Sequence, residues 1–162
     1  MAVLQLAIGG TEGAQVLGMH RQVISGQAAT VTLTEAQSGA LCLFDRAAGI
    51  VYTLPSLASI TAGTHYDFLV TVSVTSNAHK VITNVIASQF IVGSVTMVTI
   101  ATASPAGFSA NGTTIAALSA AGTTTGGLIG ETYRLTALSA TQWGISGVTV
   151  GSGVIATPFA TS

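Results

Sequence analysis

Apolar and polar residues alternate along the stretch YDFLVTVSVTS (residues 66–76). The apolar residues at every second position are Tyr66, Phe68, Val70, Val72 and Val74. Successive side chains of a strand point to opposite faces of a sheet, whereas an amphipathic helix repeats its apolar residues every three or four positions. The alternation therefore predicts a strand with one buried face, and the polar positions on its other face carry hydroxyls more often than charges.

The same alternation recurs in ATVTLTEA (residues 29–36) and IVYTLP (residues 50–55). Their predicted inward residues are Val31, Leu33, Ile50, Tyr52 and Leu54. Further candidate strands are ALCLFD, KVITNVIA, SVTMVTIA, TTIAALS, TYRLTALS, QWGIS and GVTVG. The predicted breaks RAAG, PSLASITAG, TSNAH, SPAGFSANG, AAGTTTGG and GSG contain residues that favour turns. About ten short strands at this spacing predict an all-β chain, folded as an antiparallel β-sandwich or a jelly roll.

The first 28 residues differ from the rest of the chain. They are rich in glycine, only weakly periodic, and contain Glu12, His20 and Arg21. We interpret residues 1–28 as an extended N-terminal arm and residues 29–162 as the β-sandwich domain. An additional edge strand is the alternative interpretation of the arm.

Charge is scarce, and this excludes several classes of protein. Only 6% of the residues are charged, against about 25% in an ordinary globular chain. With four Lys and Arg residues there is no basic patch for nucleic acid. No apolar run reaches the length of a membrane-spanning helix, so we expect no membrane insertion. A single cysteine, Cys42, and the lack of a secretory signal pattern predict folding in a reducing cytoplasm.

Acidic residues and possible metal ligands do not gather at one place in the sequence. The five acids are Glu12, Glu35, Asp45, Asp67 and Glu131. Because paired catalytic carboxylates must converge on one site, we expect solvated turn or surface roles for these scattered acids. His65 and Asp67 share one strand face, but a metal site needs more ligands, so a hydrogen-bonded surface pair is the favoured interpretation.

Other motifs also have structural explanations. The segment GSGVIA (residues 151–156) matches a dinucleotide fingerprint in letters, but no predicted helix follows it, so we interpret it as a turn. Cys42 lies in an apolar strand as a small hydrophobic residue would, and Tyr133 and Trp143 are expected in the core. We therefore predict that the protein is not an enzyme, with no catalytic, cofactor-binding or metal-binding residues and no cofactor.

Two long segments resemble a module of tailed-bacteriophage structural proteins. The first is TVTLTEAQSGALCLFDRAAGIVYTLPSLASITAGTHYDFLV (residues 30–70), with its S-G and FD.A.G..YTLP features. The second is GETYRLTALSATQWGISGVTVGSG (residues 130–153), with W.I.G and a Gly-rich end. Capsid decoration (cement) proteins and head-fibre or tail-fibre domains share these features. The resemblance implies a β-rich subunit, usually oligomeric, that adds to a preformed virion surface.

This resemblance and the scarcity of charge predict the same function. We expect a capsid decoration protein, made in the host bacterial cytoplasm, that binds the outer surface of the phage head and stabilises it. Its expected partners are the major capsid protein and its own copies, with a homotrimer preferred over a dimer. The alternative is a trimeric head-fibre or tail-fibre domain that binds a host receptor or polysaccharide. A secreted carbohydrate-binding module is a third possibility, which would require exposed aromatic residues.

Overall fold

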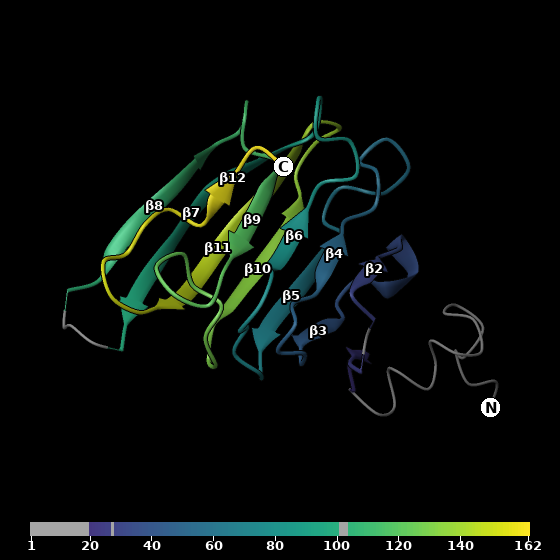
Figure 1. Cartoon of the computed structure of the whole chain (residues 1–162). Helices are drawn as coiled ribbons and strands as arrows, with labels where there is room; N and C mark the ends of the chain where they lie inside the picture. Colours follow the sequence, from purple (N-terminus) through teal and green to yellow (C-terminus); the bar gives the residue numbers. More distant parts are fainter. Residues whose placement is uncertain (1–19, 27, 101–103) are drawn as a thin grey trace, which may run out of the picture.

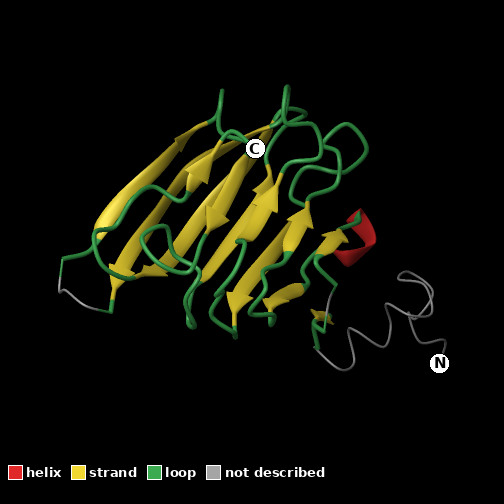
Figure 2. Cartoon of the chain, viewed as in Figure 1, coloured by secondary structure: helices red, strands yellow, loops and turns green. Residues whose placement is uncertain are grey.

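The chain folds into two β-sheets that face each other, as shown in Figure 1. The structure is a computed structural model that describes residues 20–26, 28–100 and 104–162. Strands and loops make up nearly all of it (Figure 2), together with one turn of 3-10 helix at Glu35–Gln37. The predicted all-β sandwich is therefore confirmed.

Twelve strands are divided between the two sheets of the described chain. The seven-stranded sheet has the order β1 (Val23–Ile24), β3 (Leu41–Phe44), β5 (His65–Val70), β10 (Thr132–Ala137), β11 (Gln142–Gly151), β7 (Phe90–Thr99) and β8 (Ala106–Asn111). The five-stranded sheet has the order β12 (Phe159–Ala160), β9 (Ala117–Ala120), β6 (His79–Ile82), β4 (Val51–Thr53) and β2 (Thr30–Thr32). Both sheets contain parallel and antiparallel pairs.

Four of the five parallel pairs in the described chain arise because the first six strands alternate between the sheets, and the fifth joins β7 with β11. The odd-numbered strands β1, β3 and β5 are parallel neighbours in one sheet, and β2, β4 and β6 are parallel neighbours in the other. A chain that crosses to the opposite sheet after every strand returns to each sheet in the same direction. Hairpin connections would instead have given the antiparallel pairing that the sequence predicted. The sheets of this sandwich are thus mixed.

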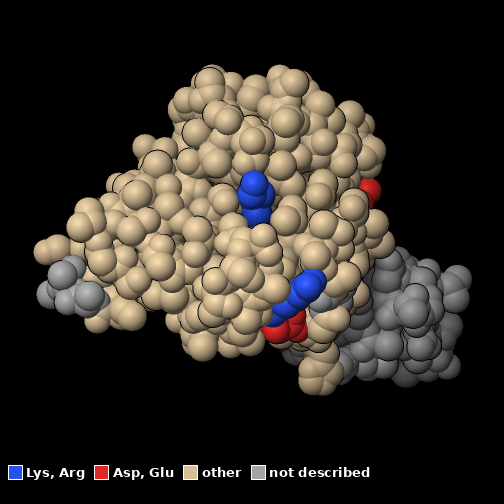
Figure 3. Space-filling model, in the orientation of Figure 1, with Lys and Arg blue, Asp and Glu red and all other residues tan. Residues whose placement is uncertain are grey.

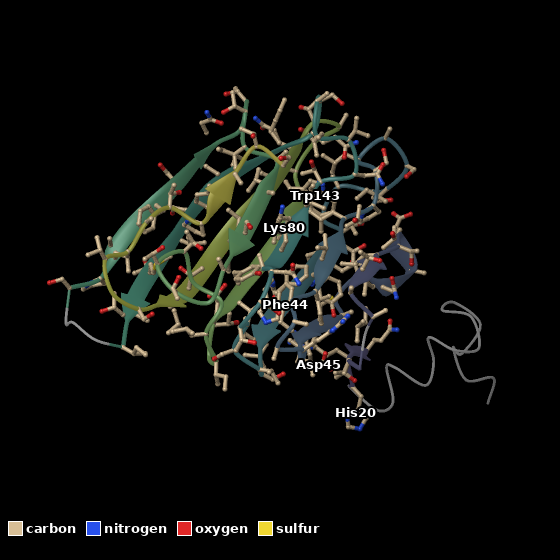
Figure 4. The ribbon with its side chains drawn as sticks, viewed as in Figure 1. His20, Phe44, Asp45, Lys80 and Trp143 are labelled. Atoms are coloured by element: carbon tan, nitrogen blue, oxygen red, sulfur yellow. The ribbon has the colours of Figure 1, made fainter. Side chains whose placement is uncertain are left out.

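The alternating residues fill the space between the sheets as predicted. Tyr66, Phe68, Ile50, Tyr52 and Leu54 are all fully buried. Phe44 lies between the sheets (Figure 4), and its ring centroid is 5.1 Å from that of Tyr52 and 5.9 Å from that of Phe68. Edge-to-face and tilted aromatic pairs of this kind add to the stabilisation from apolar burial. The core thus joins strands from both sheets.

Several predicted strand boundaries differ from the structure. The break predicted in SPAGFSANG contains β8, which pairs with β7 along six positions. The segments QWGIS and GVTVG form one strand, β11, in which Gly147 has a φ of 154° that glycine adopts readily. The strand predicted through residue 76 ends at Val70. In each case pairing with a neighbouring strand, which local sequence does not encode, determines where the strand runs.

The part of the predicted arm that the structure describes joins the seven-stranded sheet. Val23 and Ile24 form β1, which pairs with Leu41 and Cys42, and Ile24 is buried in the core. This part of the chain therefore corresponds to the alternative of an edge strand. Residues 1–19 of the predicted arm lie outside the described residues.

Candidate functional site

One half of the sandwich carries no charged residue at all. Residues 81–130 and 135–162 contain no Lys, Arg, Asp or Glu, and these ranges include β7, β8, β9, β11 and β12. Figure 3 shows one face of the molecule, on which charged atoms occupy only a few places and the β7–β8 side has none. Arg134, in a surface groove beside β7 and β11, and Lys80, whose Nζ donates to the Ser162 carbonyl oxygen, lie at its border. A partner that covers this half would therefore remove water from few charged groups.

Exposed aliphatic side chains gather at one end of the seven-stranded sheet. They are Val98, Ile100, Ile129, Val148 and Val154, with exposed fractions between 36% and 88%. We call this set the apolar end. The apolar end lies at the carboxyl ends of β7 and β11, where Thr99 is paired with Gly151. Ile129 lies just before β10, which begins at Thr132. Apolar groups that gather on a protein surface are typical of contact surfaces.

A groove of about 460 Å³ lies on the outer face of the same sheet. Val92, Leu138 and Ile145 supply apolar walls, and glycines lie between them. At Gly144 an added Cβ would come within 3.0 Å of the Leu138 side chain, so glycine leaves room for that residue. Arg134 is the charged residue of the lining. The groove is open and mostly apolar, and it brings together no acid–base pair.

Arg134 belongs to a charged cluster on the outer face of the sheet. It lies opposite Asp67 across β5 and β10, with 2.7 Å from Nε to Oδ1 and 2.8 Å from Nη2 to Oδ2. Arg21 also pairs with Asp67. The hydrogen bond from Arg134, followed by that from Arg21, lowers the pKa of the Asp67 carboxyl despite its partial burial. Because the arginines are about half exposed, the cluster positions the chain near Arg21 more than it stabilises the fold.

Two of the acids, Glu35 and Asp45, accept hydrogen bonds from the backbone of neighbouring loops. Glu35 accepts a hydrogen bond from the Thr61 backbone N–H at 2.7 Å. Hydrogen bonding by the Thr61 side chain, followed by that of its backbone, lowers the pKa of the Glu35 carboxyl. Asp45, at the rim of the sandwich in Figure 4, accepts a hydrogen bond from the Gly26 backbone. These two carboxylates therefore hold loops in place. Glu12 lies outside the described residues.

Glu131 contradicts the prediction of a surface role. Its side chain is fully buried, and Oε2 accepts hydrogen bonds from the backbone N–H groups of Gly127 (2.7 Å) and Val150 (3.2 Å). Its other oxygen, Oε1, has no partner. Burial raises the pKa of this carboxyl to about 7. The inward pattern of Tyr133 and Leu135 extends back to residue 131, so the period of two could have identified this buried acid.

His65 and Asp67 share the outer face of β5, but each has its own partners. The His65 Nδ1 lies 3.1 Å from the Gly63 carbonyl oxygen, while Asp67 binds the two arginines. The described residues contain no group of three His, Cys, Asp or Glu side chains that could hold a metal ion. The two side chains thus act as separate surface residues.

Cys42, Tyr133 and Trp143 lie in the core, as predicted. Cys42 is fully buried, and burial raises the pKa of its thiol to about 12, so the nucleophilic thiolate does not form near neutral pH. Tyr133 stacks on Phe68 at 5.4 Å and leaves no ring face for a sugar or base. The dinucleotide-like motif at 151–156 opens no helix: β11 ends at Gly151 and a bend follows at Gly153 and Val154.

The ranges 20–26, 28–100 and 104–162 contain no helix with the length and hydrophobicity needed to cross a bilayer. Within these ranges, the groove and the apolar end are exposed features with the character of contact surfaces. Comparison of the chain with protein-family models, with curated proteins and with solved structures found no match.

Proposed function

We propose that this protein is a capsid decoration protein, which binds the outer surface of a bacteriophage head and stabilises it. The observation that carries the proposal is the uncharged half of the sandwich, which ends in exposed Ile100, Ile129 and Val154. The resemblance of residues 30–70 and 130–153 to tailed-phage structural modules supports the same function. The partner is the major capsid protein, and the virion surface is the site of action.

The physical basis of attachment is burial of neutral surface. Apolar area removed from water contributes about 25 cal/mol per Å². An unpaired buried charge costs several kcal/mol, so a surface without charges avoids the largest penalty of association. Hydroxyl and backbone groups around the apolar end still form hydrogen bonds across the contact. A contact of this kind would tolerate changes in ionic strength, because salt screens interactions between charges.

Attachment should therefore withstand salt and fail when a charge enters the apolar end. We expect purified particles to retain the protein from low to molar sodium chloride. Ile129→Glu should weaken binding at least tenfold, which is about 1.4 kcal/mol, because the carboxylate loses water in the contact. Ile86→Glu is the matched control, since Ile86 is 44% exposed in the loop before β7. Sedimentation of particles with bound protein measures retention.

Two outcomes would contradict this account of attachment. Release of most copies by moderate salt would show that ion pairs dominate the contact. Equal effects of the Ile86 and Ile129 variants would show that the apolar end is not the contact surface. The number of copies on the particle distinguishes a decoration protein from a head-fibre or tail-fibre domain, because decoration requires hundreds of copies whereas a fibre requires a few or a dozen.

The protein should also associate with itself, as a trimer rather than a dimer. As a monomer it would leave the mostly apolar groove in water, and exposed apolar surface of this kind favours association. Light scattering coupled to size-exclusion chromatography should give three times the 16.1 kDa chain mass. A molar mass of 16.1 kDa, that of a single chain, would rule out a stable trimer if it were found at micromolar concentration both for the free protein and after release from particles.

A further inference from the structure

The loop of residues 121–130 folds over the start of β10 and is fastened by backbone hydrogen bonds. The carbonyl oxygens of Thr123 and Thr124 accept bonds from Ser152 and Ala156, at 2.9 and 2.8 Å. The Gly127 carbonyl oxygen accepts a bond from Val74 at 3.0 Å. The loop therefore joins the segment after β11 to the segment after β5, and it covers the carboxyl of Glu131.

The Glu131 carboxyl is enclosed without a positive partner. In the register of β10 and β11, Thr132 lies opposite Val148, so the next step places Glu131 opposite Thr149. Three buried polar atoms in this region lack partners: Glu131 Oε1, Thr149 Oγ1 and Tyr133 Oη. A charged carboxylate here would lose its hydration and gain only two backbone hydrogen bonds in return.

Few other ionisable groups lie in the elements packed around this carboxyl. Tyr133 is the inward-facing ionisable residue of β10, and burial holds the pKa of its phenol well above its usual range. The strands β7, β9 and β11, the loop itself and residues 71–78 contain no ionisable side chain. On β6, His79 pairs with Ala120 where the loop begins, and burial lowers the pKa of its ring. Its Nε2 lies 2.9 Å from the Val72 carbonyl oxygen.

Glycine is required for the loop to close on the carboxyl. Gly126 has a φ of 94°, and a Cβ there would lie 2.7 Å from Glu131 Oε2 and 3.4 Å from Thr149 Cβ. A Cβ on Gly127, at φ 95°, would lie 2.9 Å from the Ala120 carbonyl oxygen. The backbone thus packs directly against the acid, and only movement of the loop can expose Glu131 to water.

We propose that Glu131 is a protonation-controlled latch for residues 121–130. The neutral carboxyl holds the loop closed through Gly127 and Val150, and ionisation of the carboxyl favours the open loop. The proton passes to solvent when the loop opens, and it returns when the loop closes. The latch is a property of the chain alone and needs no bound partner.

The direction of the pH effect follows from the two states of Glu131. In the closed state the pKa is raised to about 7, and in the open, hydrated state it returns to the ordinary 4.5. The open state therefore binds fewer protons between these pH values, so opening becomes more favourable as pH rises through this window. The equilibrium constant for loop opening should increase by about two orders of magnitude between pH 4.5 and about 7, and it should stay constant at higher pH.

One consequence rests on the proposed function. The loop carries Ile129 of the apolar end, so a closed loop fixes part of the attachment surface. Attachment should then be tighter at pH 5 than at pH 8. The latch is tested on the free protein, so failure of attachment and failure of the latch are separate results.

Hydrogen exchange of the free protein tests the latch. We expect the Gly127 and Val150 amides to lose about a hundredfold in protection from pH 4.5 to 8, after correction for intrinsic exchange. Glu131→Gln should make protection of both amides independent of pH. The Leu135 amide, in the middle of β10, is the control and should change little. The latch would be overturned if the Leu135 amide lost as much protection as the Gly127 and Val150 amides. It would also be overturned if the pH dependence of protection were the same in Glu131→Gln as in the unmodified chain.

A second measurement uses the unmodified chain, in case the variant folds poorly. The carboxyl carbon of Glu131, followed by nuclear magnetic resonance, should titrate with a midpoint near 7. A midpoint near 4.5 would show that the carboxyl is already hydrated and would overturn the proposal. Protection at pH 8 that rises specifically with added sodium or potassium would also overturn it, since a bound cation would then hold the carboxylate.

Discussion

Replacement of Gly93 by alanine should destabilise the sandwich by about 3 kcal/mol or more. Gly93 lies in β7 opposite Ile145 of β11, with a φ of 127°. An added Cβ would lie 2.2 Å from the Ile145 carbonyl oxygen, so β7 and β11 would have to separate. Urea unfolding should show a lower midpoint with an unchanged slope.

The matched control for this substitution is Gly107→Ala in β8. No atom lies within 4 Å of a Cβ added at Gly107, so the free energy of unfolding should change by less than about 0.5 kcal/mol. Similar losses in the two variants would show that the close approach of β7 and β11 is not what requires Gly93. The pair thus separates a backbone contact from the general effect of glycine in a strand.

Removal of the Trp143 side chain should have a comparable effect. Trp143 is fully buried in β11, with its ring 6.1 Å from that of Tyr66. Trp143→Ala would leave a large cavity and should reduce the free energy of unfolding by about 3–5 kcal/mol. Trp143→Phe should cost much less, because it keeps most of the apolar volume and removes Nε1, a buried donor without a partner.

Calorimetry of the two Trp143 variants measures this difference. The phenylalanine variant should melt well above the alanine variant. If the two were equally destabilised, Nε1 would have to make a contact that stabilises the folded chain. The contrast therefore reports on both packing and the indole N–H group.

The sequence predicts the layers of this fold better than their connections. The inward positions of Tyr52, Phe68 and Trp143 follow from local periodicity, because alternate side chains of a strand share a face. The parallel pairing of β3 with β5 depends instead on β4 joining the other sheet, which no local pattern records. The strand β8 was missed for a related reason, since pairing with β7 stabilises a segment rich in turn-forming residues.

The polar contacts divide in the same way. The buried position of Glu131 follows from the alternation of Tyr133 and Leu135, although its separation from the other acids in the sequence suggests a surface role. By contrast, the pairing of Arg134 with Asp67 depends on the register of β5 and β10, which lie 67 positions apart at this contact. A register between distant strands is set by the whole core, so the sequence of either strand does not specify it.

The alternation of β1 to β6 between the sheets also affects how the chain reaches its fold. None of these six strands can form a hairpin with the next, because consecutive strands belong to different sheets. The local hairpins of the described chain, β7–β8 and β10–β11, lie in its second half. Chains dominated by such distant pairings fold in milliseconds to seconds. During synthesis, β1 to β4 therefore leave the ribosome with all their sheet neighbours in the first half of the chain, whereas β5 and β6 must wait for β10 and β9 to complete their pairing.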